Sequence, residues 1–195
     1  RFDAEVARIE TVTGRVGALR LHDGTRIETD AVIFNGDASA LGAGLLGSDV
    51  QSSAPAIRPE ARSLSAVTWC MKAETAGFPL AHHTVFFAEQ YATEFEAIFR
   101  HGRIAEQPTV YICAQDRPAS GTLGGNAAER LFVLVNAPAD GDRNSWPWDA
   151  VEDVAGKASG VLQRCGLSVE FPEAATVATT PSDFDRLFPG SGGAL

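Results

Sequence analysis

The sequence has few cysteines, few basic residues and no long apolar run, and each shortage excludes a class of protein. The cysteines are Cys70, Cys113 and Cys165, and no CxxC pair occurs, which excludes the usual zinc and dithiol motifs. No apolar stretch approaches the ~20 residues of a membrane-spanning helix. The chain has 16 basic and 25 acidic residues, which gives a net charge of -9. This negative charge argues against a nucleic-acid partner and against electrostatic docking on anionic lipid.

The composition is typical of a folded domain with a sizeable core, since 45% of the residues are hydrophobic and 21% are charged. We expect the cysteines to be reduced, buried, small side chains, because an odd count without a signal peptide is typical of a cytoplasmic protein. The chain opens at Arg1 and stops at Leu195, each beside a structured motif. We therefore expect an internal piece of a longer protein.

The hydrophobic pattern predicts an α+β chain whose mostly antiparallel sheet has helices on one face. A small antiparallel unit over residues 4–34 comes first, with a hairpin at Asp23-Gly24 and a last strand at 31–34. Residues 48–62 are a connection. Further strands are expected at 64–73, 84–87, 109–114, 131–137 and near 167–178. Helices are expected at 38–46, 90–100, 147–165 and 181–187, with Ser145 capping the third and Thr180 opening the fourth.

Two of these helices are amphipathic, and the apolar stripe of each is expected to face the core. In the helix over 90–100, the stripe consists of Tyr91, Phe95, Ile98 and Phe99. In the helix over 147–165, it consists of Val151, Val154, Ala155, Ala158, Val161, Leu162 and Cys165. The strand over 64–73 has apolar groups on both faces, which indicates that one of its faces lines a cavity.

Residue types alone identify no catalytic centre, and they indicate only an apolar ligand. Neither a GxGxxG nor a Walker loop is present; residues 121–125 suit a flexible loop, while 189–193 fit a plain turn and a close approach to a ligand equally well. His82 and His83 point to opposite faces of an extended chain, so we expect no metal site. Asp116-Arg117 fits a structural salt bridge better than the orientation of a polar substrate group.

Several ordered blocks carry a resemblance to a known family. They are His82 to Phe87 (followed by Tyr91, Glu94-Phe95 and Ile98-Phe99), Pro108 to Arg117, Glu129 to Ala139 and Thr180 to Leu195. Together they resemble the phytoene-desaturase-type carotenoid oxidoreductases. The ending Phe-Pro-Gly-x-Gly-Gly-Ala is most similar to the branch that desaturates hydroxylated or methoxylated acyclic carotenoids, the hydroxyneurosporene and methoxyneurosporene desaturases. Ala4 to Ile9 and Asp30 to Asp37 are similar to a β unit of the flavin domain in that superfamily.

The resemblance implies the substrate domain of a FAD/NAD(P)-binding, amine-oxidase-like flavoprotein with a small β unit from its flavin domain. Residues 1–47 would belong to the FAD-binding domain, 48–62 to a connection and 63–195 to the substrate-binding domain. The implied FAD contacts are Val6, Asn35, Gly36 and Asp37. The implied substrate contacts are His82, Phe86, Arg117, Gly192 and Gly193. Both FAD phosphate loops are absent from the sequence, so we expect this chain alone to bind no FAD and to be inactive.

The activity implied is removal of two hydrogens from an acyclic, 1-hydroxylated or 1-methoxylated carotenoid, with hydride passing to FAD and the proton to an unidentified base. A phytoene desaturase, a carotene isomerase, a carotenoid oxygenase and a non-catalytic carotenoid- or lipid-binding module stay open as alternatives. The implied partners are the carotenoid, a membrane surface, and a quinone or other electron acceptor. The implied location is cytoplasmic and peripheral on the inner membrane, docked through an apolar patch near Phe78 to Leu80 or Phe86-Phe87.

Overall fold

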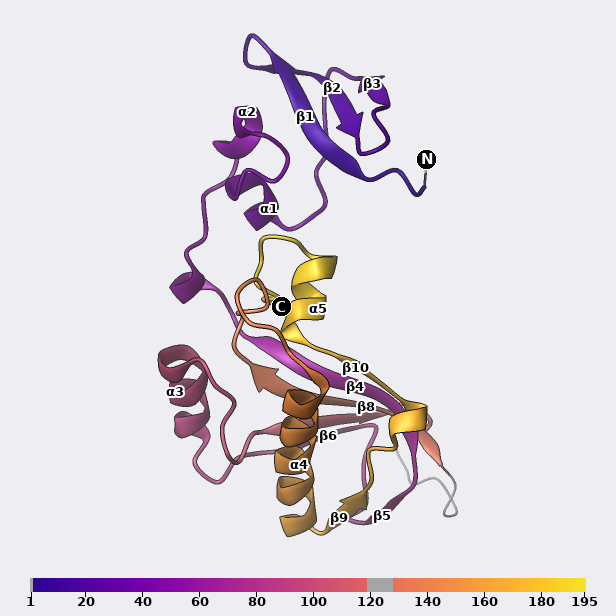
Figure 1. Cartoon of the computed structure of the whole chain (residues 1–195). Helices are drawn as coiled ribbons and strands as arrows, with labels where there is room; N and C mark the ends of the chain where they lie inside the picture. Colours follow the sequence, from indigo (N-terminus) through magenta and orange to yellow (C-terminus); the bar gives the residue numbers. More distant parts are fainter. Residues whose placement is uncertain (1, 119–127) are drawn as a thin grey trace.

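The computed structural model describes residues 2–118 and 128–195, which form a small upper sheet and a larger lower sheet (Figure 1). The strands are β1 Val6–Val12, β2 Arg15–Leu21, β3 Arg26–Glu28, β4 Ser65–Ala73, β5 Thr75–Gly77, β6 His83–Phe86, β7 Val110–Ala114, β8 Glu129–Ala137, β9 Leu167–Val169 and β10 Thr176–Thr179. The helices are α1 Ala38–Gly42, α2 Ser48–Gln51, α3 Tyr91–His101, α4 Trp148–Arg164 and α5 Pro181–Leu187, with short 3-10 turns at η1 Pro59–Ala61 and η2 Glu173–Ala175.

The small N-terminal unit is an antiparallel sheet in the order β1-β2-β3. The turn at Asp23-Gly24 is confirmed, and Gly24 adopts the positive φ of 83° that such a turn requires. The strand predicted at 31–34 is wrong, and Ile33 is 97% exposed. A strand needs a neighbour for its backbone N–H and C=O groups, and none of the described strands pairs with this run.

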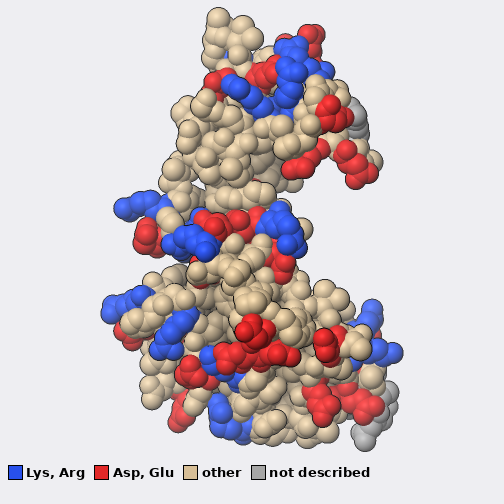
Figure 2. Space-filling model, in the orientation of Figure 1, with Lys and Arg blue, Asp and Glu red and all other residues tan. Residues whose placement is uncertain are grey.

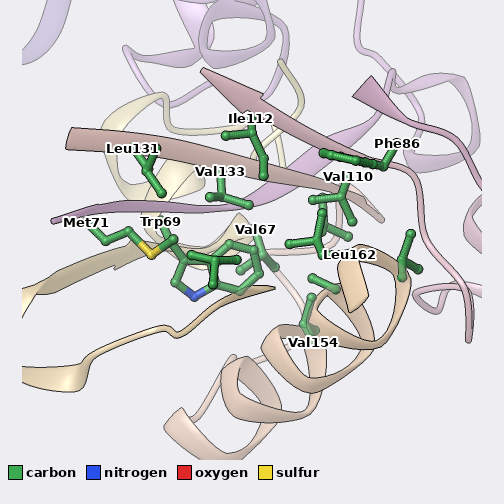
Figure 3. Packing of buried hydrophobic residues seen from close by; sticks show 14 of the residues in the cluster. Val67, Trp69, Met71, Phe86, Val110, Ile112, Leu131, Val133, Val154 and Leu162 are labelled. Carbon is green, nitrogen blue, oxygen red and sulfur yellow. The ribbon is translucent and has the colours of Figure 1, made fainter. Parts of the chain in front are cut away.

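The large sheet is antiparallel throughout, in the order β10-β4-β8-β7-β6, which confirms the α+β class predicted from the sequence. Strand side chains alternate between faces, and one face packs on α4 to form the core shown in Figure 3. The indole of Trp69 lies in this core, 1% exposed, with its ring edge-on to Phe171. The core cluster runs from Val67 to Val169 and contains no residue of the N-terminal unit.

The helix α4 buries most of the stripe predicted for it, with Ala155 half-buried. Val151, Val154, Ala158, Val161 and Leu162 are buried, whereas Cys165 follows the last helical turn and is exposed. The predicted cap at Ser145 is wrong, because Pro147 is the N-cap residue and makes no side-chain capping hydrogen bond. The prediction of buried cysteines is also wrong: Cys70 is exposed and Cys113 is half-buried, because both lie on the face of the sheet that α4 does not cover.

The helix α3 is rotated relative to the face expected, so that Ile98 of the predicted stripe is buried, Phe95 is half-buried and the other two residues are exposed. Its buried residues are Glu94, Ala97 and Ile98, while Tyr91 and Phe99 are 48% and 55% exposed. Two hydrogen bonds to a buried carboxylate set this orientation of the helix. Glu94 Oε1 accepts them from Thr109 N and Asn136 Nδ2, each 3.2 Å away. Those bonds hold the carboxylate inward and leave the aromatic residues outward.

The remaining predictions differ mostly at element boundaries. The connection at 48–62 contains α2 and η1, and the strand expected near 167–178 is split into β9 and β10 around Pro172. The start of α5 is confirmed, since Thr180 and Asp183 form a reciprocal capping box. The predicted loop at 121–125 lies outside the described residues.

Neither the helices nor the surface charges indicate a particular binding partner. No helix among the described residues is long and apolar enough to cross a bilayer. On the face seen in Figure 2, acidic and basic side chains are interspersed, and the molecule narrows between the upper unit and the lower sheet. The division of the chain into a flavin domain and a substrate domain stays a prediction.

Candidate functional site

The face of the large sheet that points away from α4 is the candidate site, and the strand register defines its residues. One row across the strands consists of Val177, Cys70, Phe132, Cys113 and His83. The next row consists of Thr179, Thr68, Leu134, Tyr111 and Val85. We call these two rows the open face. Because most of these side chains are apolar or aromatic, the open face is a wide, weakly polar floor.

The aromatic groups of the open face contact one another along its β6-β7-β8 side. Tyr111 lies edge-on to Phe132, with ring centroids 6.3 Å apart, and stacks near His83 at 6.0 Å. Val85 on the edge strand is 44% exposed, and Val177 on the opposite edge strand is 69% exposed. The floor is therefore accessible at both of its edge strands, whereas Thr68 on the inner strand β4 is buried.

A sizeable hollow lies elsewhere in the described residues. It has a volume of about 500 Å³ and is lined by η1, the end of α3 and the loop after β8. Its lining includes Glu60, Arg62, Asp140 and Arg143. Burying such charged groups beneath a hydrocarbon is unfavourable, so this hollow suits an apolar ligand less well than the open face does.

A compact polar cluster occupies the β6-β7 corner of the open face. It comprises His82, His83, Cys113 and Tyr111, and one ligand atom from each of the first three lies within 4.8 Å of the others. The expectation that the two imidazoles point apart is wrong, because β6 begins at His83 and leaves His82 outside the strand. Their ring centroids are 4.5 Å apart. Burial, followed by the neighbouring Cys113, raises the pKa of Tyr111.

Arg117 holds this corner together through a buried ion pair. Its Nε and Nη2 donate to the two carboxylate oxygens of Glu129 at 2.8 and 2.6 Å, and both side chains are almost inaccessible, at 11% and 4% exposure. Arg117 Nη1 also donates to the carbonyl of Leu80, and Nη2 to Thr75. The hydrogen bonds from Arg117 hold the pKa of Glu129 below its ordinary value.

Asp116 and Arg117 do not pair with each other. Asp116 instead accepts from the guanidinium and the backbone N–H of Arg130 on β8, which lowers the pKa of Asp116. Both residues thus form salt bridges across the β7-β8 connection, as the sequence favoured. The guanidinium of Arg117 is engaged within the protein through all of its nitrogens, and its predicted contact with a substrate stays a prediction.

Three other predicted substrate contacts have packing roles. Phe86 is 5% exposed and lies on the α4 side of the sheet, opposite the open face. Gly192 and Gly193 are buried with φ of 66° and 79°. A Cβ on Gly192 would lie 2.6 Å from the carbonyl oxygen of Ala139, and one on Gly193 would lie 2.3 Å from that of Pro181. The close approach expected of these glycines is therefore made to protein, and contact with substrate stays a prediction.

We expect Gly193→Ala to destabilise the protein by about 3 kcal/mol or more, because a positive φ costs roughly 1–2 kcal/mol and the new methyl group clashes with backbone that cannot easily move. Gly102→Ala is the matched control. Gly102 ends α3 at φ 59°, with nothing within 4 Å of a Cβ. The Gly102→Ala variant should lose only about 1 kcal/mol of unfolding free energy, the cost of placing alanine at a positive φ. Urea unfolding measures both, and equal losses would contradict the packing role.

The predicted FAD contacts lie in the N-terminal unit. Val6 is the first residue of β1 and is half-buried, while Asn35 and Gly36 are exposed in the segment without regular structure before α1. The carboxylate of Asp37 accepts from Ser39 N at 2.7 Å and caps α1. The contact of these four residues with FAD stays a prediction.

Comparison with known proteins gives the strongest indication of function, although no protein-family model matches the chain. Hydroxyneurosporene desaturase of Rubrivivax gelatinosus is 44% identical over 195 residues, which is all of this chain and 37% of that protein. The chain is homologous to hydroxyneurosporene desaturases along its whole length. The 1-hydroxycarotenoid 3,4-desaturase of a Flavobacterium species is 30% identical, with this chain spanning 39% of it. The chain thus spans a little over a third of the length of each of these relatives.

Comparison with solved structures adds nothing further about this chain. The flavin-dependent brominase Bmp2 aligns with 90% of this chain and 37% of its own, at 10% identity and a TM-score of 0.40. A similarity this low carries no inference about fold or function.

Sequence reasoning missed three residues of the candidate site. Tyr111, Cys113 and His83 face the same side of neighbouring strands, but their alignment follows only from the register of β6 against β7. The alternating pattern of strand 109–114 was a usable signal, since it puts Tyr111 and Cys113 on one face.

Proposed function

We propose that the complete gene product containing this chain is a FAD-dependent desaturase that removes two hydrogens from an acyclic carotenoid, one that is 1-hydroxylated or 1-methoxylated. The observation that carries the proposal is 44% identity to a hydroxyneurosporene desaturase along every residue of the chain. The activity requires residues beyond this chain, because it spans only 37% of that relative.

The open face supports this proposal by its chemistry. A carotenoid is a long hydrocarbon, and each Å² of apolar surface withdrawn from water contributes ~25 cal/mol. Leu134 and Phe132 on β8, and Val85 on β6, present such a surface on this face. In the proposed enzyme, the open face is the floor on which the polyene lies, and the rest of the protein covers it.

The residues present fit one edge of FAD but not its pyrophosphate. A pyrophosphate is held by free backbone N–H groups at a helix N-terminus. The N-terminus of α1 is already capped by the carboxylate of Asp37, whose negative charge disfavours a phosphate at that point. The backbone at Val6 and Asn35 remains suited to an uncharged part of the cofactor, such as the adenine.

The chemistry assigned to bound FAD is acceptance of a hydride from the polyene. This chain's share is to align the hydrocarbon, exclude water and leave the second hydrogen, as a proton, within reach of a base. The electron pair left by the departing proton forms the new double bond. The base stays unassigned, and a quinone or another oxidant would reoxidise the flavin.

The experiment uses the complete gene product in lipid with FAD and 1-hydroxyneurosporene, followed by its visible spectrum. A red shift that needs both additions shows lengthened conjugation. An equal shift with unmodified neurosporene would remove the preference for a hydroxylated substrate. No shift with either carotenoid, despite bound flavin, would favour an isomerase, an oxygenase or a binding module.

We further propose that the protein is cytoplasmic and docks peripherally on the inner membrane, where its hydrocarbon substrate dissolves. Four aromatic residues form a continuous outward row, which we call the aromatic ladder. They are Phe87, Tyr91, Phe95 and Phe99, with successive ring centroids 5.7, 4.9 and 6.3 Å apart. Of the regions named from sequence, Phe86 and Leu80 are buried, whereas Phe87 is 63% and Phe78 40% exposed.

We expect Phe87→Ser and Phe99→Ser each to weaken binding to neutral phosphatidylcholine vesicles by more than about tenfold. Half of an aromatic side chain, about 100 Å², contributes roughly 2 kcal/mol when it leaves water. Vesicle flotation measures the binding. Val12→Ser and Leu187→Ser are matched controls, because those residues are equally exposed, at 63% and 62%, away from the ladder. Equal losses in all four variants would contradict docking through the ladder.

A further inference from the structure

We propose that His82, His83 and Cys113 form a binding site for a borderline divalent transition metal, represented by Zn²⁺, at the β6-β7 corner of the open face. The site rests on the geometry of this corner and does not depend on the proposed desaturase activity.

The donor atoms are already close to the arrangement that zinc requires. Cys113 Sγ lies 3.8 Å from His82 Nε2. In a tetrahedral site with a Zn–S bond of ~2.3 Å and a Zn–N bond of ~2.05 Å, sulfur and nitrogen are about 3.6 Å apart. The third donor, on His83, lies within 4.8 Å of both. Because His83 is exposed and sits directly opposite Cys113 in the β6-β7 register, a small rotation of its ring closes the set.

Hydrogen bonds outside the donor set hold His82 in the form that binds a metal. Its Nδ1 lies 2.7 Å from the carbonyl oxygen of Arg117. A carbonyl can only accept, so Nδ1 carries the proton and Nε2 presents its lone pair toward Cys113. Metal-binding histidines are oriented in this way by a carbonyl or carboxylate on the other nitrogen. Arg117 is in turn fixed by its buried pair with Glu129.

The other histidine contacts a hydroxyl, since His83 Nδ1 lies 2.8 Å from Tyr111 Oη, which can donate or accept. Three protein donors leave a fourth position for water, the arrangement found in open zinc sites. A thiolate and two neutral imidazoles suit Zn²⁺ better than Mg²⁺ or Ca²⁺, which prefer oxygen. On binding, the Cys113 thiol loses its proton to solvent as the Zn–S bond forms, so affinity falls as pH falls.

The test is equilibrium dialysis of the complete gene product against Zn²⁺, with bound zinc counted by mass spectrometry. We expect one ion that is lost on Cys113→Ser and on His83→Asn, each with affinity at least about 100-fold lower, since even the outer partners of a zinc site are worth about 10–100-fold. Cys70→Ser is the matched control. Cys70 lies on the same row of the open face, two strands or about 10 Å from Cys113, and should leave the affinity unchanged.

A second measurement on the unaltered protein covers the case in which a variant fails to fold. Alkylation of each cysteine by iodoacetamide is followed by mass spectrometry with and without Zn²⁺. We expect zinc to protect Cys113 and to leave Cys70 and Cys165, which are both exposed, as reactive as before. Equal protection of all three thiols, no protection of Cys113, or zinc binding that survives Cys113→Ser would overturn the site.

Discussion

Replacement of Arg117 by Met should destabilise the protein by about 3–5 kcal/mol, the loss expected when one partner of a buried ion pair is removed. The Glu129 carboxylate, whose side chain is 4% exposed, would then keep only the hydroxyl of Thr75 as a hydrogen-bond donor among the partners seen here. Urea unfolding near neutral pH measures the loss. Arg130→Met is the matched control, because its pair with Asp116 is solvent-exposed and should contribute far less.

The pH dependence of unfolding distinguishes this ion pair from simple packing. In the unaltered protein the folded-state pKa of Glu129 is depressed, so the pair's contribution is present above the ordinary carboxyl pKa of about 4.3 and is lost as pH falls through the lower folded value. In Arg117→Met, burial without the cation raises the folded-state pKa above the unfolded one. The variant should therefore gain stability relative to the parent as pH falls toward 4.3, and a loss independent of pH would contradict the pairing.

Phe132→Glu should lower kcat/KM for the carotenoid by about 10- to 100-fold in the complete enzyme while leaving it folded. Phe132 lies at the centre of the open face, half-buried between Cys70 and Cys113 in the register. A neutral polar group covered by a hydrocarbon without a hydrogen-bond partner costs about 1–3 kcal/mol and an ionised carboxylate costs more, so the loss is at least about tenfold, since 1.4 kcal/mol is a factor of ten. The measurement is the initial rate of the red shift at several substrate concentrations.

Two control variants distinguish a loss of substrate binding on the open face from a loss of folding. Gln163→Glu adds the same charge at an exposed position of α4, on the other side of the sheet, and should leave kcat/KM unchanged. Val133→Glu changes the next residue of β8, which is 0% exposed on the α4 face, and should prevent folding. If Phe132→Glu were as active as Gln163→Glu, the open face would not carry the substrate.

Strands and helices were predictable from the sequence where local pattern and tertiary packing agree. The strand predicted at 64–73 is β4, and the start of α5 predicted at Thr180 is confirmed by its capping box with Asp183. The prediction for α3 was right for Ile98 but wrong for Tyr91 and Phe99, which are exposed. A buried Glu94 bonded to Thr109 and Asn136 decided its orientation, and those partners are distant in sequence.

The candidate site was less predictable, because it depends on register rather than on motifs. His82 and Arg117 were predicted as substrate contacts from the resemblance, and the structure brings both to the corner of the open face. Cys113 was expected to be an inert buried residue, yet it stands directly opposite His83. A single-residue shift in the pairing of β6 with β7 would have moved it to the other face, so composition could not have revealed the cluster.

The central claim is that the open face is the floor on which the carotenoid lies. A carotenoid analogue with a photoreactive group along its polyene chain, cross-linked to the complete enzyme and mapped by mass spectrometry, tests this claim most directly. Labels on Leu134, Tyr111, Phe132 or Val85 are the predicted result. Labels confined to the charged hollow around Glu60 and Asp140, or to the α4 side of the sheet, would contradict the account.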